Sequence, residues 1–263
     1  MFFRNGYSGF RGGYQGSSFF ELVRAEAADV APDFAALAHG LDLKDVPHGT
    51  TICTFKFEGG VVMAGDRLAT AGMRVASREV QKVFPTDSHS MIAIAGAAGP
   101  AVEMARLLSI ELEHYEKIEG ERLELDGKAN KLSQMIRQNL PAAMQGLAVV
   151  PLFAGYDLRR RVGRLWSFDI TGGRYEEGEF EATGSGGLYA GEYIKKEWRT
   201  GMNGQQALDL AVASLAAAAD EDRATGGVDL ARGIFPIVDV CTEAGIVRAT
   251  DDEVRAAYER IRS

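Results

Sequence analysis

Residues 49–66 read GTTICTFKFEGGVVMAGD, and this stretch decides the fold. Between Thr51 and Phe57 the side chains alternate with the two-residue period of a strand. Glu58-Gly59-Gly60 is typical of a hairpin turn, and a second apolar run follows at 61–64. The stretch therefore predicts two strands joined by a tight turn, the first beginning directly after Thr50.

Downstream of this hairpin, blocks of strands are followed by pairs of helices. Apolar runs predict strands at 90–95, 149–156, 164–169, 180–183 and 234–240. Helical periodicity predicts a long helix from about Pro100, a second around 132–140, two more at 187–198 and 203–222, and a polar helix at the C-terminus. Strand and helix do not alternate one by one, so we expect an α+β fold of antiparallel sheets with helices on their outer faces.

Three finer features of these helices can be checked against a structure. In the first helix, the predicted buried face comprises Val102, Ala105, Leu108, Leu112 and Tyr115. Pro141 is expected to disturb the end of the second helix. Asn203 with Gln206 three residues later predicts a capping box.

Composition narrows the class of protein. The chain has 263 residues, 46% hydrophobic and 25% charged, which is ordinary for a globular protein. A net charge of −8 disfavours a nucleic-acid binder, which needs a basic surface. Cys53 and Cys241 are expected to be buried, reduced thiols. No Cys/His spacing suggests a metal site, and no cofactor is expected.

The N-terminal part differs from the rest. Residues 1–17 are rich in Gly, Ser and Arg; the run Arg11-Gly12-Gly13 suits an RNA-binding tail, but a plain disordered arm is favoured. Residues 18–45 predict one or two short helices interrupted at Pro32. Neither a signal peptide nor a window of membrane-spanning length is found, so a cytoplasmic protein without a membrane partner is expected.

Thr50 carries the strongest chemical hypothesis. An N-terminal threonine combines a hydroxyl nucleophile with its own α-amine as general base, and that amine titrates near pH ~7.7–8.0. Thr50 would acquire the amine only if the chain were cut after Gly49, and glycine tolerates the strained backbone that self-attack requires. Alone, Gly-Thr-Thr is a weak signal, because it occurs by chance and a threonine pair that simply starts a strand is the favoured explanation.

The residues after Thr50 strengthen this hypothesis. From about 48 to 260 the chain resembles proteasome β subunits, most closely the actinobacterial type. The motifs that carry the resemblance are Thr50-Thr51-Ile52, Val61-Val62-Met63-Ala64-Gly65-Asp66-Arg67, Lys82-Val83, Ile94-Ala95-Gly96, Thr183-Gly184-Ser185-Gly186 and Asp222-Arg223-Ala224-Thr225-Gly226-Gly227. Asp66, Lys82 and Gly96 follow Thr50 by 16, 32 and 46 residues, which are the offsets of the family's catalytic Asp, Lys and oxyanion-hole Gly.

The resemblance implies a role for each matched position. Lys82 would hold a positive charge beside the Thr50 hydroxyl, and Asp66 would keep that lysine charged and oriented. The backbone N–H of Gly96 would stabilise the oxyanion. Three further residues would support the terminal amine, namely Ser185, Asp222 and Thr225. Five residues would contact substrate, namely Ala69, Thr70, Val80, Ile94 and Ala98. The last group is small or apolar apart from Thr70, which predicts cleavage after hydrophobic residues.

The same resemblance implies the architecture and the partners. We expect a four-layer αββα sandwich of the N-terminal-nucleophile hydrolases, with residues 1–49 a self-removed propeptide and residues 50–263 the catalytic domain. Heptameric β rings would stack between rings of proteasome α subunits, and a ring-shaped ATPase unfoldase would feed unfolded proteins through the α ring to be degraded to peptides.

Three other readings remain open from the sequence. One is the β-type peptidase of the bacterial two-component protease, which pairs directly with a ring ATPase. Another is a catalytically silent ring subunit, although nothing structural requires Thr50, Asp66, Lys82 and Gly96 together. The last is a non-peptidase hydrolase with an N-terminal nucleophile.

Overall fold

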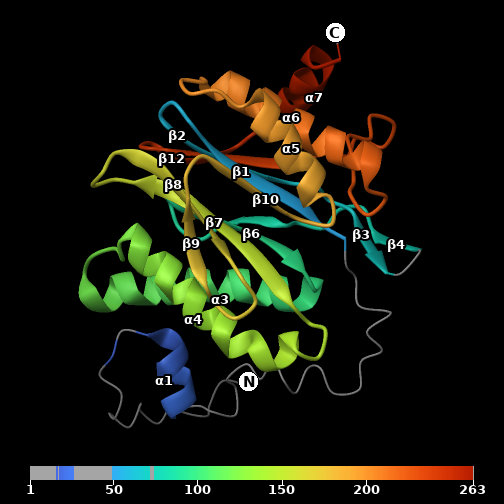
Figure 1. Ribbon diagram of the computed structural model, residues 1–263. Helices are drawn as coiled ribbons and strands as arrows, with labels where there is room; N and C mark the ends of the chain where they lie inside the picture. Colours follow the sequence, from blue (N-terminus) through green and yellow to red (C-terminus); the bar gives the residue numbers. More distant parts are fainter. Residues whose placement is uncertain (1–15, 17, 27–48, 72–73, 263) are drawn as a thin grey trace, which may run out of the picture.

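Two five-stranded antiparallel sheets form the centre of the molecule (Figure 1). The computed structural model describes residue 16 and residues 18–26, 49–71 and 74–262. The first sheet has the order β10 (Phe180–Gly184), β1 (Thr51–Phe57), β2 (Gly60–Gly65), β11 (Ile237–Thr242), β12 (Gly245–Arg248). The second has the order β5 (Val83–Pro85), β6 (Ser90–Gly96), β7 (Val149–Asp157), β8 (Val162–Phe168), β9 (Arg174–Glu177). A small ribbon pairs β3 (Ala69–Ala71) with β4 (Arg74–Ser77).

Helices cover the outer face of each sheet, which gives four layers (Figure 1). The second sheet packs against α3 (Ala98–Glu119) and α4 (Leu125–Ala143). The first sheet packs against α5 (Gly187–Glu197), α6 (Gly204–Glu221) and α7 (Asp251–Arg260). A short helix of the N-terminal segment, α1 (Phe19–Glu26), lies against α3, and the ring of Phe19 meets His114 edge-on at 5.6 Å.

The alternation of the first hairpin explains why both of its faces are buried. Ile52, Val61 and Met63 point into the layer between the two sheets. Cys53, Phe55 and Val62 point the other way and pack with residues of α5 and α6. A strand pair buried on both faces needs apolar residues at nearly every position, as 60–65 supplies.

The α+β prediction is confirmed, with differences at the ends of elements. The predicted strand at 234–240 begins only at Ile237, because Pro236 has no N–H for a strand ladder, and Ile234 pairs with Asp229 instead. Of the strands absent from the prediction, β3, β4, β5, β9 and β12 have only three or four residues, too few to show a period. Of the N-terminal predictions, α1 accounts for one short helix, and 1–15 and 27–48 lie outside the described residues.

The predicted helices are present, but the buried face predicted for α3 is correct at only three of its five positions. Ala105, Leu108 and Leu112 are buried, whereas Val102 is 46% exposed and Tyr115 is only partly buried. The Asn203 capping box is present, and Pro141 lies in the last turn of α4. Both cysteines are free and buried, and burial raises the pKa of Cys53 to about 11.

Two valines give a matched test of the layer between the sheets. Val61 is fully buried there, whereas Val247 on β12 is 67% exposed. Val61→Ala should lower the free energy of unfolding by about 1–3 kcal/mol, because it leaves a cavity in a packed interior. Val247→Ala should change it by less than about 0.5 kcal/mol. Urea unfolding followed by circular dichroism measures both, and equal losses would contradict this account of the layer.

Candidate active site

Residue 50 directly precedes β1, at one end of the strands of the first sheet. Its carbonyl oxygen accepts a hydrogen bond from the Ser185 N–H at 2.8 Å, and Thr51 pairs with Gly184 at the end of β10. Just before it, Gly49 has φ +92°, and a Cβ there would lie 2.7 Å from Thr70 Oγ1. Only glycine fits this conformation and this space. The short distance also shows that Thr70 lies beside residue 49.

A buried carboxylate organises the surroundings of that bond. Asp66 directly follows β2 and is fully buried. Its two oxygens accept from the N–H groups of Thr51, Leu68 and Gly226 at 2.7, 2.9 and 2.9 Å, and from Lys82 Nζ at 2.6 Å. Four donors match the acceptor-only character of a charged carboxylate, so this arrangement suits an ionised Asp66.

Lys82 is nearly buried and uses all three of its N–H donors. Besides Asp66 Oδ1, its Nζ contacts Leu68 O at 2.5 Å and the carbonyl oxygen of Gly49 at 3.0 Å. Its main-chain oxygen accepts from Ile94 N–H, which ties residue 82 to β6. Burial lowers the pKa of Lys82 below its ordinary value, and the charge and hydrogen bond of Asp66 oppose that shift.

The Thr50 hydroxyl lies against the bond that precedes it. Thr50 Oγ1 donates to the Gly49 carbonyl oxygen at 2.6 Å, so that oxygen receives both this hydroxyl and Lys82 Nζ. With residue 49 attached, the nitrogen of Thr50 is an amide and no α-amine is present. The arrangement can polarise the Gly49 carbonyl and holds a nucleophile next to it.

A second polar group lies on the other side of residue 50. Thr225 Oγ1 donates to Asp222 Oδ2 at 2.6 Å, and Ser185 Oγ donates to Thr50 O at 3.4 Å. Burial alone would raise the pKa of Asp222, but the hydrogen bonds that it accepts, including those from Thr225 and the Ala224 N–H, and the charge of Lys82 outweigh burial and hold that pKa below its ordinary value. Thr51 had no role in the predicted site, although its buried hydroxyl lies 2.6 Å from Thr225 Oγ1.

The predicted substrate-contacting residues gather around a cavity of about 20 Å³ beside Thr50, with room for roughly one water. Four of the five line it, namely Ala69, Val80, Ile94 and Ala98. Further lining residues are Gln81, Phe84 and Ala101, which the sequence did not single out, and Val102, which was predicted for the core. Gly96 lines it as well. Val102 is exposed because it borders this cavity and not the core.

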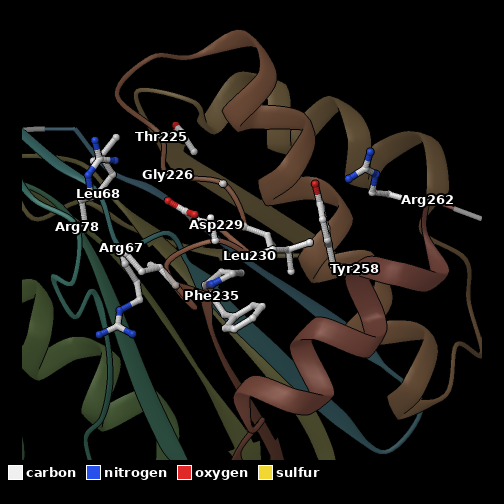
Figure 2. Close-up of a pocket in the computed structure, with 15 residues that line it drawn as sticks. Arg67, Leu68, Arg78, Thr225, Gly226, Asp229, Leu230, Phe235, Tyr258 and Arg262 are labelled. Carbon is white, nitrogen blue, oxygen red and sulfur yellow. The ribbon is translucent and has the colours of Figure 1, made fainter.

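Thr225 and Gly226 also border a wider groove of about 470 Å³ (Figure 2). Figure 2 shows Arg67 and Arg78 on one side of the groove and Tyr258 and Arg262 on the other. The loop that supplies a hydrogen bond to Asp66 is therefore accessible from outside the sheets.

In 18–26, 49–71 and 74–262, no three His, Cys, Asp or Glu side chains form a group that could hold a metal ion. Among the described helices, none combines the length and apolar character needed to cross a membrane.

The fold itself requires glycine at position 96. Gly96 has φ +114°, and a Cβ there would lie 2.2 Å from the Ala148 carbonyl oxygen, whereas a Cβ at Gly99 would meet no atom within 4 Å. Gly96→Ala should therefore destabilise the chain by about 2 kcal/mol or more. Gly99→Ala, in the exposed first turn of α3, should be neutral or slightly stabilising. Thermal unfolding of both variants checks this, and an unchanged Gly96→Ala would contradict it.

Comparison with known proteins identifies the family. A family model described as "Proteasome subunit" matches residues 46–231. The chain is 54% identical to a protein named "Proteasome subunit beta" from Streptomyces griseus, over 90% of this chain and 84% of that one. It is 50% identical to a protein of the same name from Acidothermus cellulolyticus (93% and 86% covered) and 54% identical to one from Acidimicrobium ferrooxidans (90% and 85%). With its fold, its sequence and this similarity in agreement, the chain belongs to the proteasome subunit family.

Proposed function

We propose that this chain is the precursor of a threonine endopeptidase, the β subunit of a 20S proteasome core particle, and that it cuts itself between Gly49 and Thr50. One observation carries the proposal: the Gly49 carbonyl oxygen accepts from both the Thr50 hydroxyl and Lys82 Nζ. The similarity to proteasome β subunits supports the setting in which the peptidase works.

This geometry supports self-cleavage by the following steps. Thr50 Oγ1 attacks the Gly49 carbonyl carbon while Lys82 Nζ stabilises the negative charge that develops on the oxygen. The hydroxyl proton passes to the nitrogen of residue 50 as the C–N bond breaks, which leaves an ester between Gly49 and Thr50 Oγ1. Water then hydrolyses the ester and releases residues 1–49 with a free carboxylate. Thr50 keeps its hydroxyl and gains an α-amine.

The mature site then repeats the attack on other chains. The α-amine takes the proton of Thr50 Oγ1 as this oxygen attacks a substrate carbonyl, and it gives the proton to the leaving amine. An acyl-threonine ester forms and is hydrolysed by water. Lys82, held by Asp66, keeps a positive charge near the alkoxide, while Ser185, Asp222 and Thr225 orient the amine. Gly96 N–H is the proposed oxyanion donor.

The cavity beside Thr50 is the proposed pocket for the residue that precedes the cut bond. Seven of the twelve residues that line it are apolar, and four of these, Ala69, Val80, Ile94 and Ala98, are proposed to decide its shape. An apolar lining favours hydrophobic side chains, because burying them needs no polar partner. Thr70, next to Gly49, is the proposed contact with the substrate main chain.

The leader and the partners complete the proposal. Residues 1–49 are a propeptide that keeps Thr50 without a free amine until assembly, and residues 50–263 are the catalytic domain. Heptameric β rings stack with rings of α subunits in the cytoplasm, and a ring-shaped ATPase delivers unfolded proteins. A β-type peptidase that pairs directly with its ATPase is disfavoured by the relatives, and co-purification with α subunits distinguishes the two.

A covalent probe tests whether the subunit is active. A β-lactone acylates a nucleophilic N-terminal threonine, so mass spectrometry of the assembled particle should find one adduct, on the peptide that begins at Thr50. A fully assembled particle without this adduct would make the chain a silent structural subunit.

Thr50→Ala should abolish both removal of the leader and peptide hydrolysis, because it deletes the proposed nucleophile. Intact mass after mixing with α subunits measures the first, and cleavage of a fluorogenic peptide measures the second. Thr200→Ala, at an exposed turn, is the control and should be processed normally. Normal processing of Thr50→Ala would show that another protease makes the cut.

Lys82→Ala should lower the rate of leader removal by roughly a hundredfold or more, since it removes the positive charge beside the Gly49 oxygen. The variant should still fold, because Asp66 keeps its three main-chain N–H donors, but at a lower stability, since the buried carboxylate loses its charged partner. Lys195→Ala removes an exposed lysine and serves as the control. Wild-type turnover in a folded Lys82→Ala variant would remove Lys82 from the mechanism.

A further inference from the structure

Thr51 joins two parts of the site that are far apart in the sequence. It is fully buried at the start of β1, and its N–H and C=O bond to the carboxylate and the N–H of Asp66. Its side chain contacts the other group: Thr51 Oγ1 accepts from Gly186 N–H at 2.9 Å and lies 2.6 Å from Thr225 Oγ1. Thr51 thus links the loop after β10 to the loop after α6.

The direction of these hydrogen bonds follows from proton counting. Asp222 has a lowered pKa and only accepts, so the single hydroxyl proton of Thr225 goes to Asp222 Oδ2. Thr225 Oγ1 must then accept from Thr51, whose own oxygen is taken by the Gly186 N–H. The chain of donors runs in one direction, from Gly186 through Thr51 and Thr225 to Asp222, and such chains strengthen each member.

Residue 186 must be a glycine for these two hydroxyls to lie beside the loop. A Cβ at Gly186 would lie 2.5 Å from both Thr51 Oγ1 and Thr225 Oγ1. The loop that carries Ser185 therefore approaches the two hydroxyls only because residue 186 lacks a side chain. Ser185 in turn holds the Thr50 carbonyl by its N–H.

We propose that the Thr51 hydroxyl is a positioning residue for the reaction: through Thr225 it holds the Asp222 carboxylate in the orientation that supports the α-amine of Thr50. This inference rests on the proposed function. Thr51 contacts neither substrate nor the reacting atoms, and it acts only through the chain of hydroxyls. A carboxylate held near the amine favours its protonated form, so loosening Asp222 lowers the pKa of the amine.

The test is the pH profile of kcat/KM in assembled, mature particles. Thr51→Val removes the hydroxyl and keeps the shape. It should lower kcat roughly tenfold, change KM by less than about twofold, and move the ascending limb of the profile to lower pH by about half a unit or more. Thr51→Ser keeps the hydroxyl and should restore both values. The described titratable groups around residue 50 are Asp66 after β2, Lys82 before β5 and Asp222 at the end of α6, and all remain in every variant.

Thr54→Val is the matched control. Thr54 is also a fully buried threonine of β1, but its hydroxyl donates to the Val62 carbonyl at 2.8 Å within the sheet. The Thr54→Val variant should be less stable than the wild type, but the ascending limb of its pH profile should not shift. Thr51→Ala removes the same hydroxyl without a branched side chain and is measured in parallel, so that poor assembly of one variant does not decide the result.

A double-variant cycle separates positioning from general structure. If Thr51 acts through Thr225, Thr51→Val should add little to the loss and the shift caused by Thr225→Val. An unshifted limb in both Thr51→Val and Thr51→Ala, or effects that add fully to those of Thr225→Val, would overturn the inference while leaving Thr50 as nucleophile. A wild-type particle that forms no probe adduct at Thr50 would instead overturn the proposed function and this inference with it.

Discussion

One buried carboxylate, that of Asp66, ties together parts of the chain that are distant in sequence. It accepts from the start of β1, from the turn after β2, from the loop after α6 and from Lys82. A charge removed from water is tolerated only while its hydrogen bonds are complete, so none of these segments can move alone without a large cost. A buried ion pair contributes little net stability; its consequence here is that the lysine and the Gly49–Thr50 bond have fixed relative positions.

The antiparallel topology explains why the site residues meet. In such a sheet the first residues of one strand lie beside the last residues of its neighbour. Ile52 pairs with Gly65, and Thr51 pairs with Gly184, so Thr50, Asp66 and Ser185 are brought to one end of the first sheet. Lys82 and Gly96 lie at the ends of β5 and β6 in the second sheet, where the sandwich brings them to the same edge.

What the sequence could predict depended on the range of the interaction. The first hairpin, the capping box at Asn203 and the fold class follow from local periods, and they are correct. The prediction for Val102 was wrong because a period identifies a stripe, here buried at Ala105, Leu108 and Leu112, but not where along the helix that stripe stops being covered. Family offsets indicated Asp66 and Lys82. Thr51 was missed because its partners Gly186 and Thr225 are 135 and 174 residues away, and no local pattern reports contacts across such separations.

The backbone of Gly49 has a consequence for using this structure as a guide to substrates. With φ +92°, and with Thr70 Oγ1 only 2.7 Å from where a Cβ would lie, residue 49 adopts a conformation that an L-amino acid with a side chain avoids. In the proposed mechanism, a substrate residue whose side chain enters the cavity beside Thr50 must therefore hold its main chain differently. The bond proposed for self-cleavage and the bonds of later substrates would be presented in two distinct poses, so an inhibitor designed on the path of residue 49 would copy an approach that is used only once.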